Sequence, residues 1–233
     1  MSGVHCFLRN SLNSPEIPRV DGLGILGNLA ERVLRLKQRL HSWEDALPTA
    51  PFVWAGNSAH QQLAQRAYEQ STTLVRNDEG LLPLRLDPTE PLCVLAPQPD
   101  TFSQASDKIH HHEFLVESLR QRHPTVQALA LSAQPTDADY TQALHAARSA
   151  IVTIVLTLNA NLDQHQADLM RRLLQANVPV IGLAVGNPYD LLAFPALRTY
   201  LATCEYTRPA LGAAVGVLFG ERQAQGKLPV NLP

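Results

Sequence analysis

Ala150-Ile-Val-Thr-Ile-Val-Leu-Thr-Leu158 is an unbroken apolar and β-branched run, followed by a polar, turn-like segment over residues 159–164. A helical pattern then covers residues 164–176, and a second apolar run covers residues 178–185. Short runs without polar alternation are typical of strands that are buried on both faces. Two such strands joined by a helix form a βαβ unit, which requires a parallel sheet and a right-handed crossover. Residues 150–192 therefore predict the centre of an α/β fold.

Capping signals mark both ends of the helix in this unit. Asn161 and Gln164 have the spacing of a capping box, in which two side chains satisfy free backbone N–H groups of the first turn. Asn177 follows the last turn, and asparagine tolerates the left-handed conformation that often ends a helix. We therefore expect Asn161 to cap the helix and Asn177 to end it.

Strands alternate with helices from residue 91 to residue 219. The other strands are predicted at Pro91–Ala96, Val126–Leu131 and Thr199–Cys204, and the other helices at residues 113–121, 136–147 and 208–219. This order predicts a mostly parallel sheet with helices on both faces. The expected fold class is α/β, a three-layer α/β/α sandwich.

A helical arm precedes the predicted sandwich. Residues 1–21 show no hydrophobic period, whereas residues 23–43 carry an apolar stripe at helical spacing. A break rich in proline and alanine follows this stripe. We therefore expect residues 1–50 to form a lead-in and linker helix, and residues 51–233 to form the sandwich domain.

The sandwich domain is predicted to begin with a helix and a reversal of the chain. The helix covers residues 57–70, with Asn57 or Ser58 as its cap, and its apolar side chains are expected to face inward. These side chains are Leu63, Ala64, Ala67 and Tyr68. Residues 71–84 then indicate extended chain around a turn at Asn77–Gly80. This pattern resembles a hairpin or a sharp strand reversal.

Composition excludes several classes of partner. The net charge is −2, so nothing predicts binding to nucleic acid or to an anionic membrane. The first residues lack the apolar core of a signal peptide, and no segment has the roughly 18 uninterrupted apolar residues of a membrane span. We therefore expect a cytoplasmic chain with an ordinary globular core.

Two motifs suggest a cofactor or a metal, and neither has the context that such a site needs. Gly22-Leu-Gly-Ile-Leu-Gly27 matches the dinucleotide fingerprint, but the preceding residues are too short and too rich in proline for a central strand. His110-His-His112 places three histidines side by side, whereas zinc sites use separated ligands. We predict no cofactor and no metal. The sequence also lacks a Gly-x-Ser-x-Gly nucleophile elbow and a Walker loop.

The candidate site is Gly186-Asn-Pro-Tyr-Asp190, which follows the second strand of the central unit. Open α/β sheets bind ligands at the carboxyl ends of their strands. Asn187, Tyr189 and Asp190 offer a hydrogen-bond donor, a stacking ring and an acceptor at this position. The structural alternative is a helix start, with Asn187 as cap and Pro188 in the first turn. The two roles are compatible.

Three segments in this order resemble the C-terminal domain of glycoside hydrolase family 3. They are Ala67–Leu84, Gly186–Leu191, and Val217-Leu-Phe-Gly-Glu221 leading to Gly226-Lys-Leu-Pro-Val230. The helix with Arg32-Val-Leu-Arg-Leu-Lys37 looks like the segment that leaves the preceding barrel in this family. The resemblance covers roughly residues 25–233 and is closest to the β-N-acetylhexosaminidase branch, because no insertion interrupts residues 159–166.

The resemblance implies a division of labour between two domains. In this family a (β/α)8 barrel holds the nucleophilic aspartate, and in the hexosaminidase branch it also holds the acid/base histidine and aspartate. A barrel needs roughly 200 residues or more, and only about 90 residues precede Pro91. The β-glucosidase insertion with its acidic residue is absent too, so no catalytic role is transferred to Asp163, Asp168 or Glu205.

We therefore predict the accessory C-terminal domain of a retaining β-N-acetylhexosaminidase, without catalytic residues of its own and inactive as an isolated chain. Its partner would be a (β/α)8 barrel in cis or in trans, and its ligand an N-acetylated sugar at the rim of the barrel. Asn187, Tyr189 and Asp190 are the candidates for that rim or for the barrel interface. The alternative is a free-standing small-molecule or carbohydrate-binding module on a flavodoxin-like scaffold. A stand-alone hydrolase is the third reading.

Overall fold

The computed structural model describes residues 22–40, 56–98 and 112–231. The chain divides into two units, residues 1–56 and 57–233, and the described part of the first unit is essentially helix α2 (Gly22–Leu40). The glycines of the Gly22–Gly27 motif lie within this helix. Along its described part, Leu29, Val33 and Leu36 lie on one face and are exposed. No described helix is long and apolar enough to cross a membrane.

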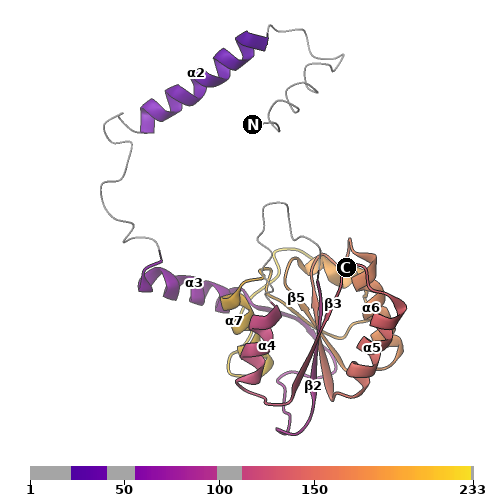
Figure 1. Cartoon of the computed structure of the whole chain (residues 1–233). Helices are drawn as coiled ribbons and strands as arrows, with labels where there is room; N and C mark the ends of the chain where they lie inside the picture. The colour runs from indigo at the N-terminus through magenta and orange to yellow at the C-terminus, as the bar shows by residue number, and fades with distance from the viewer. Residues whose placement is uncertain (1–21, 41–55, 99–111, 232–233) are drawn as a thin grey trace. The chain divides into compact units, whose positions relative to one another are not determined.

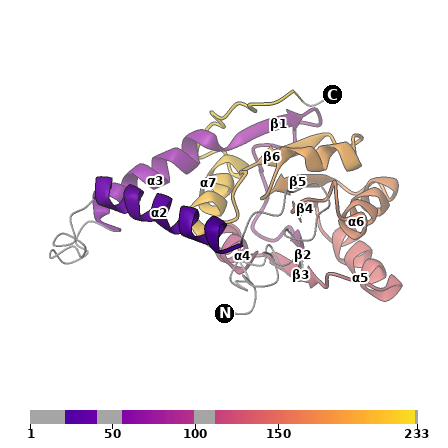
Figure 2. The same ribbon diagram turned by 90° about the horizontal axis from the view of Figure 1, so that it is seen from above.

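The second unit is built on a six-stranded sheet (Figures 1 and 2). Its strand order is β1-β6-β5-β4-β2-β3, and only the pairing of β1 with β6 is antiparallel. The strands are β1 (Thr73–Asn77), β2 (Leu92–Pro97), β3 (Val126–Leu131), β4 (Val152–Thr157), β5 (Val180–Ala184) and β6 (Thr199–Ala202). The prediction of a mostly parallel sheet is confirmed.

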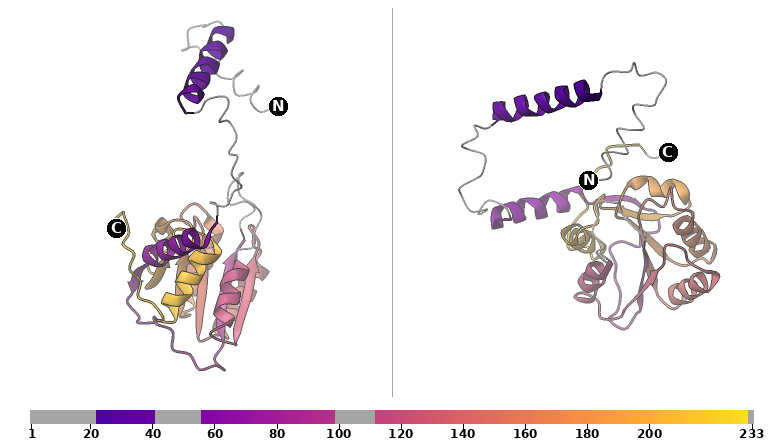
Figure 3. Two further views of the ribbon diagram at one scale, coloured as in Figure 1. Left: turned by 90° about the vertical axis from the view of Figure 1, so that its left-hand side faces the viewer. Right: turned by 45° about the horizontal axis from the view of Figure 1, so that its top comes forward.

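Helices cover both faces of this sheet, which gives the predicted three-layer sandwich (Figure 3). Helices α4 and α7 pack on one face, and α5, α6 and the 3-10 helix η2 pack on the other. The helices of the second unit are α3 (Ser58–Ser71), α4 (His112–Arg120), α5 (Asp137–Arg148), α6 (Gln164–Gln175), η2 (Pro188–Ala193) and α7 (Arg208–Leu218). Each face has its own apolar core of strand and helix side chains.

The central βαβ unit forms as predicted, with one correction at the start of its helix. All six residues of β4 and all five of β5 are buried, and the two strands run parallel. Asp163 caps α6, because its carboxylate accepts the N–H of His165 at 2.9 Å. The capping box predicted for Asn161 is therefore wrong, since Asn161 lies in the preceding turn. Asn177 does adopt the left-handed conformation, with φ of 52°.

Residues 71–84 contain a chain reversal, but the hairpin alternative is wrong. Strand β1 pairs with β6, more than 100 residues later, and residues 81–84 form no strand. The Asn77 side chain holds the turn: its Nδ2 donates to the Leu82 carbonyl at 2.9 Å, and its Oδ1 accepts the Leu82 N–H at 3.2 Å. Arg76 donates to the Pro195 carbonyl at 2.7 Å, which ties the turn to the chain before β6.

The segments around this turn meet the C-terminal residues in one place, which we call the motif corner (residues 76–84 and 220–226). Gly220 has φ of 71°, and a Cβ there would lie 2.7 Å from the Pro83 side chain. Gly226 donates its N–H to the Thr72 carbonyl at 3.0 Å, and a Cβ on it would collide with the Thr73 hydroxyl. Glycine is therefore required at both positions by the closeness of the chain.

Helix α3 differs from its prediction. It begins after the predicted cap Asn57, whose side chain accepts the His60 N–H at 2.9 Å. Leu63, Ala64 and Ala67 are exposed, although they were expected to face inward, and none of the residues of α3 is buried. Among the described elements, the main packing partner of α3 is α7, which leaves much of the α3 surface uncovered.

Candidate functional site

The carboxyl ends of β4 and β5 carry two adjacent loops, which together we call the β4–β5 edge. It consists of residues 159–163 after β4 and residues 186–193 after β5, the second of which includes η2. The strands are parallel neighbours, so their carboxyl ends meet at the same side of the sheet. This is where open α/β sheets place ligands and partners.

A pair of asparagines joins the two loops. The Nδ2 of Asn187 donates to the Oδ1 of Asn159 at 2.5 Å, and the Oδ1 of Asn187 accepts the Tyr189 N–H at 2.9 Å. Asn159 is left-handed, with φ of 55°, which turns its side chain towards Asn187. A Cβ on Gly186 would lie 2.7 Å from the Leu158 side chain, so the close approach of the loops requires glycine.

Asp190 lies beneath this edge and is fully buried. Its Oδ1 accepts the N–H of Asn161 from the other loop at 3.4 Å. Burial raises the pKa of Asp190 to about 6, and the Thr157 hydroxyl and the N–H groups of Asn161 and Ala160 partly oppose this rise. The nearby carboxylate of Asp163 adds to it. The environment therefore favours a neutral carboxyl at moderately acid pH.

Three apolar side chains point outward from the edge. Leu162 is 82% exposed, Leu192 47% and Tyr189 39%. Leu162 comes from the loop after β4, and the other two come from η2. Below them, the Tyr200 hydroxyl donates to the Pro188 carbonyl at 3.3 Å and supports η2 from β6. The edge therefore combines a polar, buried foundation with an apolar outer surface.

The three residues predicted for the site have different positions in it. Asn187 is half-buried and caps η2, as the structural alternative proposed, and Pro188 follows in the first turn. Tyr189 is exposed, whereas Asp190 has no exposed surface through which to contact a partner directly. Sequence reasoning missed Leu162, although a leucine inside a polar loop is the kind of signal that marks an exposed apolar side chain.

Within the described ranges, the carboxylates near the edge already have structural partners. Asp163 caps α6 and accepts a hydrogen bond from Gln166 Nε2 at 2.8 Å, and Asp168 forms an ion pair with Arg171. No group of three or more metal-ligating side chains exists among the described residues. Two members of the His110–His112 motif lie outside them, and the third, His112, contacts Gln98 through Nδ1 at 3.0 Å. These arrangements stabilise loops and offer no pair of carboxyl groups facing a common space.

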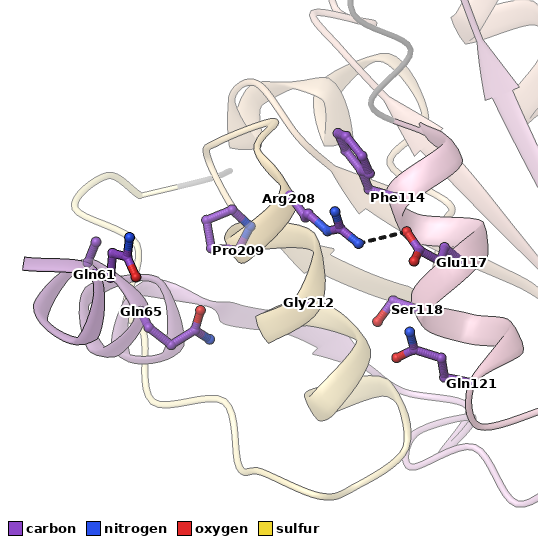
Figure 4. A pocket seen from close by; sticks show the side chains of 10 residues that line it. Gln61, Gln65, Phe114, Glu117, Ser118, Gln121, Arg208, Pro209 and Gly212 are labelled. Carbon is purple, nitrogen blue, oxygen red and sulfur yellow. Dashed lines mark hydrogen bonds and ion pairs between the residues drawn. The ribbon is translucent and has the colours of Figure 1, made fainter. Parts of the chain in front are cut away.

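A groove lies between α3, α4 and α7, on the face of the sheet that α4 and α7 cover (Figure 4). It is an open groove of about 620 Å³. Arg208 lies across it, donating to Glu117 at 2.8 Å, with its guanidinium 4.9 Å from the centre of the Phe114 ring. Gln65 and Gln121 add amide groups to the lining. The charges of the groove are already paired, so it offers mainly amide groups and an aromatic edge.

A much smaller hollow lies beside the β4–β5 edge. The hollow between the ends of β2 and β3 and the start of α6 has a volume of about 10 Å³ and is lined in part by Tyr140, Asp163 and His165. This is at most the space of a single water molecule.

Comparison with known proteins identifies the family. The glycosyl hydrolase family 3 C-terminal domain matches residues 72–233 of this chain. A search of curated proteins finds no match. Among solved structures, a fungal multi-domain family 3 β-N-acetylglucosaminidase is 30% identical, with a TM-score of 0.73 over 87% of this chain and 23% of its own.

Other solved structures of family 3 enzymes share this fold. A family 3 β-N-acetylglucosaminidase from Paenibacillus sp. is 27% identical, with a TM-score of 0.70 over 86% of this chain and 38% of its own. A β-glucosidase from Listeria innocua, 16% identical with a TM-score of 0.61, covers 82% of this chain and 30% of its own, and shares the fold. The chain thus spans well under half the length of these enzymes. It belongs to the glycosyl hydrolase family 3 C-terminal domains.

Proposed function

We propose that this chain is the accessory C-terminal domain of a retaining β-N-acetylglucosaminidase, and that its β4–β5 edge docks against the catalytic (β/α)8 barrel in cis or in trans. The observation that carries the proposal is the exposed apolar surface of Leu162, Tyr189 and Leu192 at the edge. Exposed apolar surface is a mark of protein contact sites when its side chains lie together. The two loops that hold them are joined by part-buried hydrogen bonds, which supports a preformed surface.

The family relationship supports this assignment. C-terminal domains of this family partner with an N-terminal barrel domain in the parent enzyme. Both structures quoted above at more than 25% identity are β-N-acetylglucosaminidases, and this chain spans 23% and 38% of them. The branch predicted from the uninterrupted loop after β4 is therefore the branch of the most similar structures quoted above.

Chemistry also favours an accessory role. Retaining hydrolysis needs a nucleophile and an acid/base group placed on either side of the scissile bond. In the described residues, Asp163 and Asp168 are engaged in a cap and an ion pair, and Asp190 is buried. We therefore place the catalytic groups on the barrel and give this domain the task of shaping the rim of the site around an N-acetylated sugar. A cytoplasmic location stays a prediction from the sequence.

A carbohydrate-binding module is the second candidate, and the groove between α3, α4 and α7 favours it. Its volume of about 620 Å³ is within the range of small-molecule sites. Titration of the chain with N-acetylglucosamine, followed by NMR, would show shifts around Phe114 and Gln121 if this groove binds the sugar. Shifts confined to the β4–β5 edge would instead support the rim role.

The test of the proposed function is hydrolysis of a chromogenic N-acetylglucosaminide. Three samples are compared: the purified chain, a barrel-only fragment of the Paenibacillus enzyme, and their mixture, with the full-length enzyme as positive control. We expect no turnover by the chain alone and more turnover by the mixture than by the barrel fragment. Turnover by the chain alone that survives repurification would show that it carries catalytic groups.

A further inference from the structure

Asp190 connects the two loops of the β4–β5 edge from within the protein. It lies between the exposed Tyr189 and Leu192 in the chain, yet its own side chain is fully buried. Its carboxyl reaches away from η2 and accepts the N–H of Asn161 at 3.4 Å. A carboxylate in the first turn of a helix usually stays exposed and interacts with the free N–H groups there. Here the side chain instead bridges to the neighbouring loop.

The surroundings of this carboxyl contain no described positive charge. Thr157 acts on it from β4, Tyr200 lies near it on β6, and Asp163 acts on it from the cap of α6. Of these groups Asp163 is the only other carboxyl, and its effect is to disfavour a negative charge on Asp190. None of the ion pairs among the described residues includes Asp190. A buried negative charge without a cation is unfavourable, whereas a neutral carboxylic acid is tolerated and can also donate a hydrogen bond.

We infer that Asp190 is a proton-dependent positioning residue: as a neutral acid it latches the loop after β4 to η2, and its ionisation loosens the β4–β5 edge. The latch fixes the relative positions of Leu162, which follows Asn161, and of Tyr189 and Leu192, which flank Asp190. That this edge docks a barrel rests on the proposed function. The latch itself is a property of the isolated chain and can be tested without a partner.

Hydrogen exchange of the full chain, read by mass spectrometry, tests the latch. Protection of residues 158–163 and 186–194 is measured at pH 5 and pH 8 and corrected for the intrinsic pH dependence of exchange. With a pKa of about 6 in the closed edge and an ordinary value in the open edge, opening should become about tenfold more frequent between these pH values. Asp190→Asn keeps a neutral acceptor, so it should hold protection at both pH values.

Controls separate the latch from general loosening. Asp78→Asn removes an exposed carboxyl in the turn after β1 and should keep the pH response of the parent. Asp190→Ala removes the acceptor of the Asn161 N–H and should exchange faster at both pH values. The inference is overturned if the parent protein shows equal corrected protection at pH 5 and pH 8, or if Asp190→Asn loosens the edge at pH 5. If Asp190→Ala does not fold, the parent protein and Asp190→Asn still test the inference.

Discussion

The β4–β5 edge and the motif corner use their side chains in opposite ways. In the motif corner the polar side chains have partners: Asn77 closes a turn, Glu221 pairs with Arg122 after α4, and Arg222 pairs with Glu69 of α3. At the β4–β5 edge polar groups are buried and apolar side chains point out. The corner is therefore complete by itself, whereas the edge exposes apolar surface that a partner could cover.

This difference separates the residues that identify the family from those proposed to act only in part, because the resembling segment Gly186–Leu191 also contains Tyr189 and Asp190. The segments Ala67–Leu84 and Val217–Val230 carry much of the resemblance, and in the structure they hold the edge strand β1 and the C-terminal residues together. The proposed docking residue Leu162 belongs to neither segment. The two terminal segments of the resemblance therefore serve folding, whereas Leu162 is found only from its exposure in the structure.

The largest expected effect concerns Asp190 and the pH dependence of stability. Its pKa is raised from 3.8 to about 6 in the folded chain. The stability that the proton provides is thus fully present below about pH 4 and is lost as pH rises through 6. Two pKa units correspond to about 3 kcal/mol. Asp190→Asn should therefore be more stable than the parent at pH 8 by up to that amount, as measured by urea unfolding.

The advantage of Asp190→Asn should shrink as the pH falls towards 4. Asp78→Asn, which changes an exposed carboxyl at the motif corner, should follow the parent at every pH. An equal difference between Asp190→Asn and the parent at pH 4 and pH 8 would show that Asp190 does not change its protonation between them.

The next effect is at the motif corner. Asn77→Ala removes two hydrogen bonds, and it leaves the N–H and carbonyl of the buried Leu82 without these partners. The expected loss is about 2 kcal/mol, or about 5 °C in melting temperature for a domain of this size. Thermal unfolding followed by circular dichroism measures it. Asp78→Ala, in the same turn, is the control and should melt with the parent; a similar drop in both would mean that turn propensity, and not the Asn77 clamp, is responsible.

The smallest effect concerns the ion pair of Arg122 and Glu221. The Nε of Arg122 donates to Oε1 of Glu221 at 2.6 Å, and its Nη2 donates to Oε2 at 2.8 Å. The hydrogen bond from Arg122 holds the pKa of Glu221 below its usual range. The pair therefore adds to the folding stability at pH values above the usual pKa of glutamate, and this stability is lost as the pH falls through the lowered pKa. Because both side chains are partly exposed, Glu221→Gln should cost less than about 1 kcal/mol, and about 1 M salt should reduce the difference. A cost that does not change with salt would point to lost packing.

Much of the fold follows from local patterns in the sequence. The buried runs at residues 150–158 and 178–185 predict β4 and β5, and Asn57, Asn177 and Asn187 have the capping or terminating roles expected of them. These features are local because backbone hydrogen bonds and caps involve residues that are close in sequence. The structure confirms them for that reason.

Features that depend on distant parts of the chain were not predictable. Strand β1 pairs with β6 across more than 100 residues, so no local signal distinguishes it from a hairpin. Leu63 has helical spacing, but spacing does not say whether another element covers the residue. Asp190 is a charged residue type in a loop, which favours the surface, and its burial follows from how two loops meet.

Binding between this chain and a barrel fragment of a family 3 β-N-acetylglucosaminidase tests the central proposal most directly. Leu162→Ser is compared with Ile151→Ser, an equally simple change of an exposed apolar residue just before β4, at the opposite end of that strand. Isothermal titration calorimetry should show at least about tenfold weaker binding for Leu162→Ser and unchanged binding for Ile151→Ser. Equal affinities for the two variants and the parent would contradict docking through the β4–β5 edge.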